Sequence, residues 1–254
     1  MTAPAVSVIV CAYTEKRWHQ LVRAVESVGA GRQPLEVVVV VDNNDLLLAR
    51  ARRRWPQHAV LPNAGPRGLS HARNTAIAQA SGEILAFLDD DAYGHDGWLD
   101  ALVAPFASPD VVAAGGVAVP LWPAGRPASI PPELDWVVGC SFAGQQREGI
   151  VRNVMGCNMA FRAAELVAIG GFDTGLGRVG ALPLGAEETD ACIRVRQANP
   201  GARVVFVPDA VVSHSVTSQR ATARYMLSRS YAEGISKAAL DINGCEISIG
   251  HLRT

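Results

Sequence analysis

The sequence lacks the long apolar run, the excess of one charge and the cysteine spacing that mark several large classes of protein. No stretch approaches the ~18 consecutive apolar residues that are needed to span a bilayer. The net charge is only −1, so we expect no general attraction for nucleic acid and no nucleic-acid partner. The five cysteines form neither a CxxC pair nor a zinc-type spacing, which favours free thiols in a reducing compartment.

Other absences concern targeting signals, repeats and phosphate-binding loops. Residues 1–5 carry no basic region, so we expect a cytoplasmic protein, with peripheral contact to the inner face of the membrane left open. The chain has no internal repeat or low-complexity tract, which argues against a solenoid. No glycine lies between Ala12 and Trp18, which argues against the phosphate loop of a nucleotidyltransferase. The sequence does contain 49% hydrophobic residues, enough for a large core.

Apolar runs of strand length alternate with helix-like segments through the first half of the chain. Short apolar runs bounded by turn residues are typical of strands that are buried on both faces of a parallel sheet. The predicted strands are 6–12, 35–41, 59–61, 82–89 and 111–119, and the predicted helices are 16–28, 45–55, 68–80 and 96–106. The arginine run within 50–54 is predicted to be a solvated helix face. The alternation as a whole predicts βαβ units in an α/β fold.

The second half of the chain is organised differently. Five prolines within 120–132 stop regular structure and predict a loop or crossover. Beyond it we predict an extended segment at 151–161, helices at 163–169 and from 187, a strand at 203–207, and one or two amphipathic helices over 217–240. The glycine-rich connection 170–185 is consistent with a lid that closes over substrate or with a plain surface loop.

Three consecutive carboxylates, Asp89, Asp90 and Asp91, end the predicted strand 82–89. Open α/β sheets bind ligands beyond the carboxyl ends of their strands. Because side chains alternate along extended backbone, Asp89 and Asp91 are expected on one side and Asp90 on the other. Oxygen ligands of this kind suit Mg²⁺ or Mn²⁺. A solvated acidic turn is the alternative that these residues leave open.

Three other residues have both a chemical and a structural interpretation. Glu188 is a candidate general base at the start of a predicted helix, where acidic residues also stabilise the helix dipole. His214 ends an apolar run and is either a metal ligand beside Asp91 or an ordinary hydrogen-bonded histidine. Arg73 opposes the dipole of helix 68–80, so we expect an anion beside it, either a bound phosphate or carboxylate or an internal aspartate.

Eight short motifs occur in a fixed order between residues 6 and 214. They are SVIVCAY at 7–13, VVVDNN at 39–44, ARN at 72–74, FLDDD at 87–91, GCNMAFR at 156–162, GGFD at 170–173, EETD at 187–190 and VPDAVVSH at 207–214. Each motif is weakly specific, but eight in one order are very unlikely to arise by chance. Together they resemble the family 2 glycosyltransferases with the GT-A fold.

The resemblance implies an α/β GT-A fold, in which helices flank a Rossmann-like, mostly parallel central sheet. Residues 1–214 would form the glycosyltransferase domain, with 1–119 as the nucleotide-sugar-binding half and 120–214 as the acceptor and catalytic half. Residues 215–254 would form a C-terminal helical extension, packed on the catalytic domain or lying on a membrane surface.

The resemblance also implies a role for each matching residue. The nucleotide sugar would contact Ala12, Tyr13, Glu15, Asp42, Arg73, Asp89 and Asp90. Asp91 and His214 would bind the metal, Mn²⁺ or Mg²⁺. Glu188 would be the catalytic base, and Glu187 and Asn158 would lie near the acceptor or the transferred sugar.

The implied activity is that of a metal-dependent inverting glycosyltransferase. It would move a sugar from a nucleoside-diphosphate sugar, UDP-sugar first, to a hydroxyl of a small molecule or glycan by direct displacement. The alternatives are a noncatalytic nucleotide-sugar-binding relative and a metal-dependent phosphatase of the haloacid dehalogenase type. The presence of both Glu188 and His214 favours an enzyme. The phosphatase is disfavoured because its acidic motif lies near the start of the fold and does not continue as Ala92-Tyr93.

Overall fold

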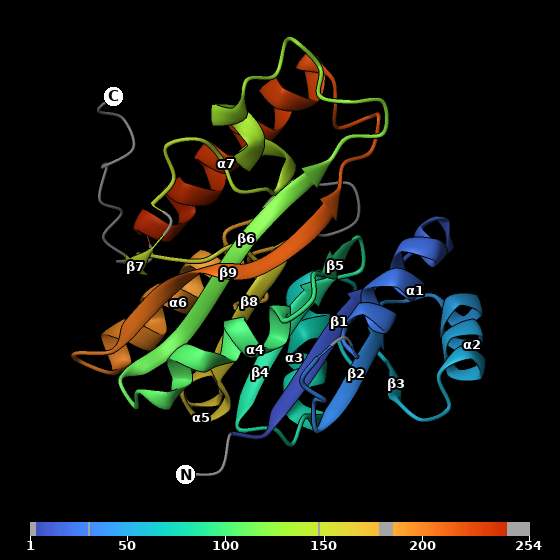
Figure 1. The fold of residues 1–254 in the computed structure, drawn as a ribbon, viewed down its shortest axis with the longest axis vertical. Coiled ribbons are helices and arrows are strands. Elements are labelled where there is room, and N and C mark those ends of the chain that lie inside the picture. The colour runs from blue at the N-terminus through green and yellow to red at the C-terminus, as the bar shows by residue number, and fades with distance from the viewer. Residues whose placement is uncertain (1–3, 30, 147, 178–184, 243–254) are drawn as a thin grey trace.

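The valine-rich segments predicted as strands belong to one mixed sheet (Figure 1). The computed structural model describes residues 4–29, 31–146, 148–177 and 185–242. Within these ranges the strands are β1 (Val6–Ala12), β2 (Glu36–Val41), β3 (Ala59–Pro62), β4 (Ile84–Asp89), β5 (Ala92–Gly94), β6 (Val111–Leu121), β7 (Gly149–Ile150), β8 (Asn158–Arg162) and β9 (Arg203–Ser215). The helices are α1 (Trp18–Ser27), α2 (Asp45–Arg54), α3 (Leu69–Gln79), α4 (Trp98–Val103), α5 (Ala163–Ala168), α6 (Glu187–Ala198) and α7 (Ala223–Ile242), with 3-10 helices η1 (Glu15–Arg17), η2 (Ala104–Ala107) and η3 (Pro132–Val138).

The order of the strands explains where the site forms. The sheet runs β3-β2-β1-β4-β8-β6-β9-β5, with β7 paired to β9. The four strands β1 to β4 are parallel to one another, as the βαβ pattern predicts. β8 is antiparallel to both β4 and β6, so the second half of the sheet is mixed. The C-terminal ends of β1, β2 and β4 therefore lie side by side at one end of the strands, where an α/β sheet binds its ligands.

Alternate residues of the central strands enter two different hydrophobic cores. Val8 and Val10 of β1 pack in a core with residues of α1, α2 and α4. Ile9 packs in a second core with residues of α3 and α6. Because successive side chains of a strand point to opposite faces, helices must cover both faces of β1. The prediction of strands buried on both sides is confirmed, and it accounts for the nearly continuous apolar sequence of β1 and β2.

Several element boundaries differ from the prediction. β9 continues to Ser215 instead of ending at Val207, because a bulge carries it past Pro208, where Gly116 pairs with Val207 and Val117 with Val211. β5 was not predicted, since three residues are too few to show a period. The extended segment predicted at 151–161 is regular only in β8. The predicted loop at 120–132 is shorter, with β6 reaching Leu121 and η3 beginning at its end.

The described part of the glycine-rich connection is tied to the protein. The guanidinium of Arg194 in α6 donates to the carbonyls of Ile169 and Gly171 at 2.7 and 2.8 Å. Asn74 of α3 exchanges two hydrogen bonds with the backbone of Phe172. A lid formed by residues 170–177 alone would have to break these bonds. The predicted lid also includes residues 178–184, which lie outside the described residues.

α7 packs against η3 and α6, which agrees with the packed arrangement among the two that were predicted for the C-terminal helix. Its buried residues are Met226, Ala232, Ser236 and Leu240. Met226 shares a core with residues of η3, and Leu240 shares one with Ala186 and Ile193 at α6. None of the helices in the described part of the chain is long and apolar enough to cross a membrane. Residues 243–254 of the predicted extension lie outside the described residues.

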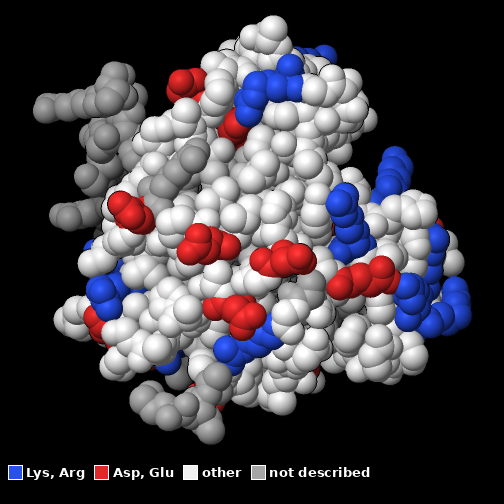
Figure 2. All heavy atoms as spheres, viewed as in Figure 1, with Lys and Arg blue, Asp and Glu red and all other residues white. Residues whose placement is uncertain are grey.

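The arginine run of α2 lies on the surface and is paired locally. In Figure 2, basic side chains gather on the side of the molecule where Figure 1 places α2. Arg54 forms an ion pair with Glu26, and the guanidinium of Arg50 lies 4.0 Å from the ring centroid of Trp18. This agrees with the predicted solvated helix face.

Candidate active site

Strand pairing brings the carboxylate triplet to His214. β5 begins directly after Asp91 and pairs antiparallel with β9, with Ala92 opposite His214. The backbone N–H of Ser215 donates to the carbonyl of Asp91 at 2.8 Å. The Nε2 atom of His214 lies 3.2 Å from Oδ1 of Asp91. Asp89, Asp91 and His214 each offer one donor atom, and these three atoms all lie within 4.8 Å of one another.

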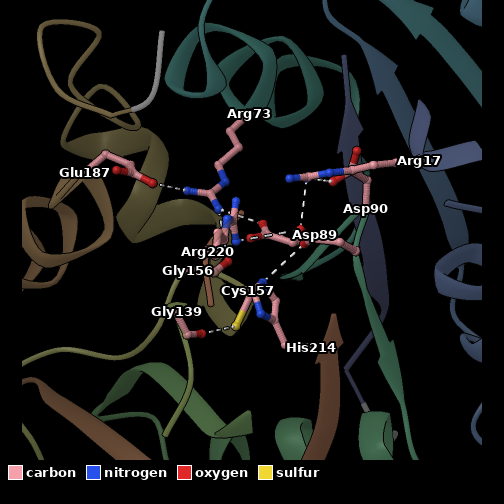
Figure 3. A network of polar contacts seen from close by, with 11 residues as sticks. Arg17, Arg73, Asp89, Asp90, Gly139, Gly156, Cys157, Glu187, His214 and Arg220 are labelled. Carbon is pink, nitrogen blue, oxygen red and sulfur yellow. Dashed lines mark hydrogen bonds and ion pairs between the residues drawn. The ribbon is translucent and has the colours of Figure 1, made fainter. Parts of the chain in front are cut away.

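Two arginines that sequence reasoning did not assign to the site also lie at the triplet (Figure 3). Arg17, in η1 just beyond the end of β1, binds Asp90 at 2.8 Å and Asp91 at 3.0 Å. Arg220, before α7, lies 3.9 Å from Asp91. The sequence does contain a feature that could have identified Arg17. It lies just after β1, and the C-terminal end of β1 is next to that of β4. The amphipathic pattern of 217–240 had assigned Arg220 to a helix, whereas it lies before the first residue of α7.

The pKa values of Asp91, His214 and Asp90 are shifted in different ways by burial and by their charged neighbours. Burial raises the pKa of Asp91, but His214, Arg17 and Arg220 hold it well below its usual value. Burial lowers the pKa of His214, yet the Asp91 carboxylate beside it raises the pKa to about 10. Burial raises the pKa of Asp90 to about 7 against the opposing effect of Arg17. A divalent ion that binds Nε2 of His214 would therefore displace a proton.

The side chains fit a hard divalent cation. Two carboxylates and one imidazole make an oxygen-rich donor set, which is compatible with Mn²⁺ and Mg²⁺. β4 ends at Asp89, so Asp90 and Asp91 lie in a turn where the predicted alternation of side chains does not apply, and Arg17 contacts both of them. The Oδ2 atom of Asp90 is buried without a hydrogen-bond partner among the described residues. A buried polar oxygen without a partner is rare in folded proteins and costs free energy.

Arg73 joins the metal side of the site to α6. Its side chain is 2% exposed, and its guanidinium contacts Oε1 of Glu187 at 2.8 Å, Oδ1 of Asp89 at 3.2 Å and the Gly156 carbonyl at 3.0 Å. Figure 3 shows Arg73 between these groups. The anion expected beside Arg73 is thus internal, an aspartate together with a glutamate. A contact of Arg73 with the nucleotide stays a prediction.

Glu188 follows Glu187 on α6 and is partly buried. Burial is the main cause that raises the pKa of Glu188 to about 8, and the negative charge of Glu187 adds to it. A carboxylate with a pKa near the working pH is suited to take a proton from a hydroxyl. Glu187 itself is buried against Arg73, so its carboxylate positions the start of α6 instead of facing open solvent.

The turn before α6 holds a strained residue. Ala186 has a φ of 73° and forms the left-handed N-cap of α6. A side chain in this region costs ~1–2 kcal/mol, whereas glycine adopts it freely. We therefore expect Ala186→Gly to stabilise the protein by up to ~1 kcal/mol, measured by urea unfolding. Ala191→Gly, in the middle of α6, is the matched control and should destabilise by ~1 kcal/mol. A loss of stability in Ala186→Gly would contradict the assignment of strain.

Several of the residues predicted to contact the nucleotide lie at the C-terminal ends of β1 and β2. Ala12 is buried at the end of β1, and Tyr13 and Glu15 beyond it are exposed. Asp42 follows β2, and its carboxylate accepts hydrogen bonds from the Asn63 side chain at 2.7 Å and from the Gly68 N–H at 3.0 Å. The structure thus gathers these residues at one edge of the sheet.

Asn158 does not join this group. Its side chain is fully buried in β8, where it accepts a bond from Trp98 Nε1 and donates to the carbonyls of Val117 and Ala210. All these bonds link strands and α4 inside the core. The expectation that Asn158 contacts the acceptor or the sugar has no support in this geometry, since the motif placed it by its sequence neighbours and not by the direction of its side chain.

Comparison with known proteins identifies the family. Residues 7–165 match the family model described as Glycosyl transferase family 2. The chain is 35% identical over 243 residues to the glucosyl-dolichyl phosphate glucuronosyltransferase of Haloferax volcanii, covering 93% of this chain and 77% of that protein. It is similar in fold to the mannosyltransferase PcManGT of Pyrobaculum calidifontis in complex with GDP-Man and Mn²⁺, with a TM-score of 0.62, 22% identity, and coverage of 98% of this chain and 78% of that chain. It is also similar to GalNAc-T7 with UDP, GalNAc and Mn²⁺, with a TM-score of 0.62, 19% identity, and coverage of 85% and 44%. The protein belongs to glycosyl transferase family 2 and has the GT-A fold of those enzymes.

Proposed function

We propose that this glycosyltransferase is metal-dependent and inverting, and that Glu188 is its general base. The observation that carries the proposal is the position of Arg73, which bonds Asp89 of the Asp89/Asp91/His214 group and Glu187 beside the base. The buried guanidinium of Arg73 thus joins the candidate metal ligands to the start of α6, the helix that carries Glu188. Membership of the family removes the phosphatase alternative.

The proposed reaction follows from the charges of these groups. Asp89, Asp91 and His214 would hold Mn²⁺ or Mg²⁺, which would neutralise the charge that grows on the leaving nucleoside diphosphate. Glu188 takes the proton of the acceptor hydroxyl as its oxygen attacks the anomeric carbon. The bond from that carbon to the diphosphate oxygen breaks on the opposite side, so the configuration inverts without a covalent enzyme intermediate. Arg220 is a further cation on the diphosphate side, next to Asp91.

The donor is expected to be a nucleoside-diphosphate sugar, with UDP as the first candidate nucleotide. Tyr13 is exposed at the edge of the sheet and can contact a flat base, and Asp42 can accept a hydrogen bond from it in exchange for one of its present bonds. Solved proteins of similar fold contain UDP or GDP-Man, which motivates testing both nucleotides.

Binding of nucleotide and metal tests the donor site directly. We expect one of UDP, GDP, dTDP and CDP to stabilise the protein against heat in the presence of Mn²⁺, by ~2.7 kcal/mol at 100 times its Kd. Asp91→Asn should abolish the part of the shift that depends on Mn²⁺, whereas Asp96→Asn, at an exposed aspartate outside the metal group, should keep it. A shift of equal size with and without metal in the wild type would contradict metal dependence.

For the acceptor, we propose a sugar hydroxyl on a lipid-linked phosphate carrier. The support is the name of the Haloferax volcanii relative, which specifies a glucosyl-dolichyl phosphate, together with the outer face of α7. That face exposes Leu227 by 75%, Tyr231 by 74% and Ile235 by 47%, one helical turn apart, with Arg224 exposed beside them. Glu233 is paired with Arg229, so the charge of exposed Arg224 is left to attract an anionic lipid surface.

Vesicle binding tests this membrane contact. Phosphatidylglycerol vesicles should bind the wild type more tightly than phosphatidylcholine vesicles because of Arg224. The triple substitution Leu227→Ser, Tyr231→Ser and Ile235→Ser should weaken the binding at least ~10-fold, since three apolar side chains no longer enter the lipid. Val167→Ser, at an exposed apolar residue of α5, is the matched control and should have no effect. Equal binding of the triple variant and the wild type would contradict the contact.

A further inference from the structure

The two ring nitrogens of His214 face different partners. Nε2 lies 3.2 Å from Oδ1 of Asp91, and Nδ1 lies 3.5 Å from Sγ of Cys140. His214 is 3% exposed and Cys140 is 0% exposed, so water does not compete for either contact. Cys140 is a free thiol. The site uses the Nε2 side of the ring, and nothing in the proposed reaction accounts for a sulfur on the other side.

A neutral imidazole that binds a metal through one nitrogen carries its proton on the other. When Nε2 of His214 faces the carboxylates, the Nδ1–H can donate to the Cys140 sulfur. Partners of this kind fix the tautomer and the rotation of a ligating histidine and contribute to metal affinity. We propose that Cys140 is a positioning residue, which holds the His214 ring so that Nε2 completes the metal site with Asp89 and Asp91. This inference rests on the proposed metal dependence.

Cys140 is not itself a member of the donor group. Asp89, Asp91 and His214 are the His, Cys, Asp and Glu side chains that gather within 4.8 Å in the described ranges, and Cys140 is not among them. The sulfur lies on the Nδ1 side of the ring, away from the carboxylates. Its role is therefore to act through His214, and not to bind the metal directly.

The backbone holds the sulfur on a fixed segment. Cys140 follows η3, and its N–H donates to the Asp135 carbonyl at 3.0 Å. The Asp135 carboxylate is held by both terminal nitrogens of Arg126, at 2.7 and 2.6 Å. Next to Cys140, Ser141 bonds the backbone of Ala118 in β6 through its N–H and through its hydroxyl. The thiol is thus placed by bonds on both sides.

Gly139 completes the support of the ring. Its φ of 84° lies in the left-handed region, and a Cβ at this position would lie 3.5 Å from Cε1 of His214. Figure 3 shows Gly139 on the same side of the site as His214, where its carbonyl accepts a bond from Cys157 at 3.5 Å. The turn that carries Cys140 therefore packs along the imidazole edge. This turn lies within residues 120–214, the half that the family resemblance predicts to bind the acceptor, and it contacts a ligand of the candidate metal.

The test compares three variants of the full chain by the binding of Mn²⁺, followed by electron paramagnetic resonance. Cys140→Val removes the acceptor at nearly constant volume and should raise the Kd for Mn²⁺ ~10–100-fold. Cys140→Ser keeps an acceptor and should remain within ~3-fold of the wild type. Cys192→Ala, at a buried cysteine of α6 outside the site, is the control for a general packing defect and should leave the Kd unchanged. Thermal unfolding verifies that each variant is folded.

A second readout follows the histidine itself. The ¹⁵N shifts of His214 with Mg²⁺ bound should report the Nδ1–H tautomer in the wild type and in Cys140→Ser, and a mixture of tautomers in Cys140→Val. Unchanged affinity and unchanged tautomer in Cys140→Val would overturn the positioning role while metal binding by the wild type still stands. Equal losses in the Ser and Val variants would also overturn it, because they would indicate packing. No binding of Mn²⁺ or Mg²⁺ by the wild type would overturn both this inference and the proposed metal dependence.

Discussion

Glu188→Gln should lower the rate of sugar transfer ~10²–10⁴-fold while the protein still binds the nucleoside diphosphate and Mn²⁺. The amide has nearly the shape of the carboxylate but cannot accept the proton of the acceptor hydroxyl. The measurement is the turnover number with saturating donor and acceptor, together with the thermal shift given by nucleotide and metal. Glu133→Gln, at an exposed glutamate of η3, is the matched control and should leave both unchanged. A Glu188→Gln enzyme with more than a tenth of the wild-type rate would contradict the assignment of Glu188 as the general base.

The rate of the wild type should also depend on pH with a defined sign. A general base works only when it is ionised, and burial together with Glu187 raises the pKa of Glu188 to about 8. The rate should therefore increase as pH rises toward 8 and level off above it. In Glu188→Gln the remaining rate should lose this rise. A flat profile through this range in the wild type would mean that another group takes the proton.

Arg73→Met should destabilise the protein by ~3–5 kcal/mol, the second large effect that we expect. Arg73 is 2% exposed and Glu187 is 6% exposed, so the substitution leaves a buried carboxylate without its cation. Asp89 is one-third exposed, and water can replace much of its contact with Arg73. The free energy of unfolding in urea measures the loss.

Two further variants separate the ion pair from the rest of the side chain. Adding Glu187→Gln to Arg73→Met should recover part of the loss, because the uncompensated charge is then removed. Arg53→Met, at an exposed arginine of α2, is the control and should change the stability by less than ~0.5 kcal/mol. If Arg73→Met destabilised the protein no more than this control, the assignment of Arg73 as a buried ion-pair link between Asp89 and Glu187 would be wrong.

Local patterns predicted much of the fold because they act over a few residues. The apolar runs of β1 and β4 are buried on both faces, so their sequences alone indicate central strands. The triplet Asp89 to Asp91 begins at the last residue of β4, at the C-terminal end of the parallel strands, where α/β sheets bind ligands. The sequence could not predict β5, although its pairing with β9 is what brings His214 to Asp91. A strand of three residues has no period to detect, and its register depends on a partner about 120 residues away.

The amino-acid sequence by itself determined the α/β class, the carboxylates at a strand end, the candidate base at a helix start and the resemblance to family 2 glycosyltransferases. These features depend on residue type and short spacing. The tertiary structure decided which charges meet: Arg73 with Glu187, 114 positions apart, and Arg17 with Asp90, 73 positions apart. It also buried Asn158 in the core and set Cys140 behind His214. Long side chains can reach several partners, and only the packing of strands and helices selects among them.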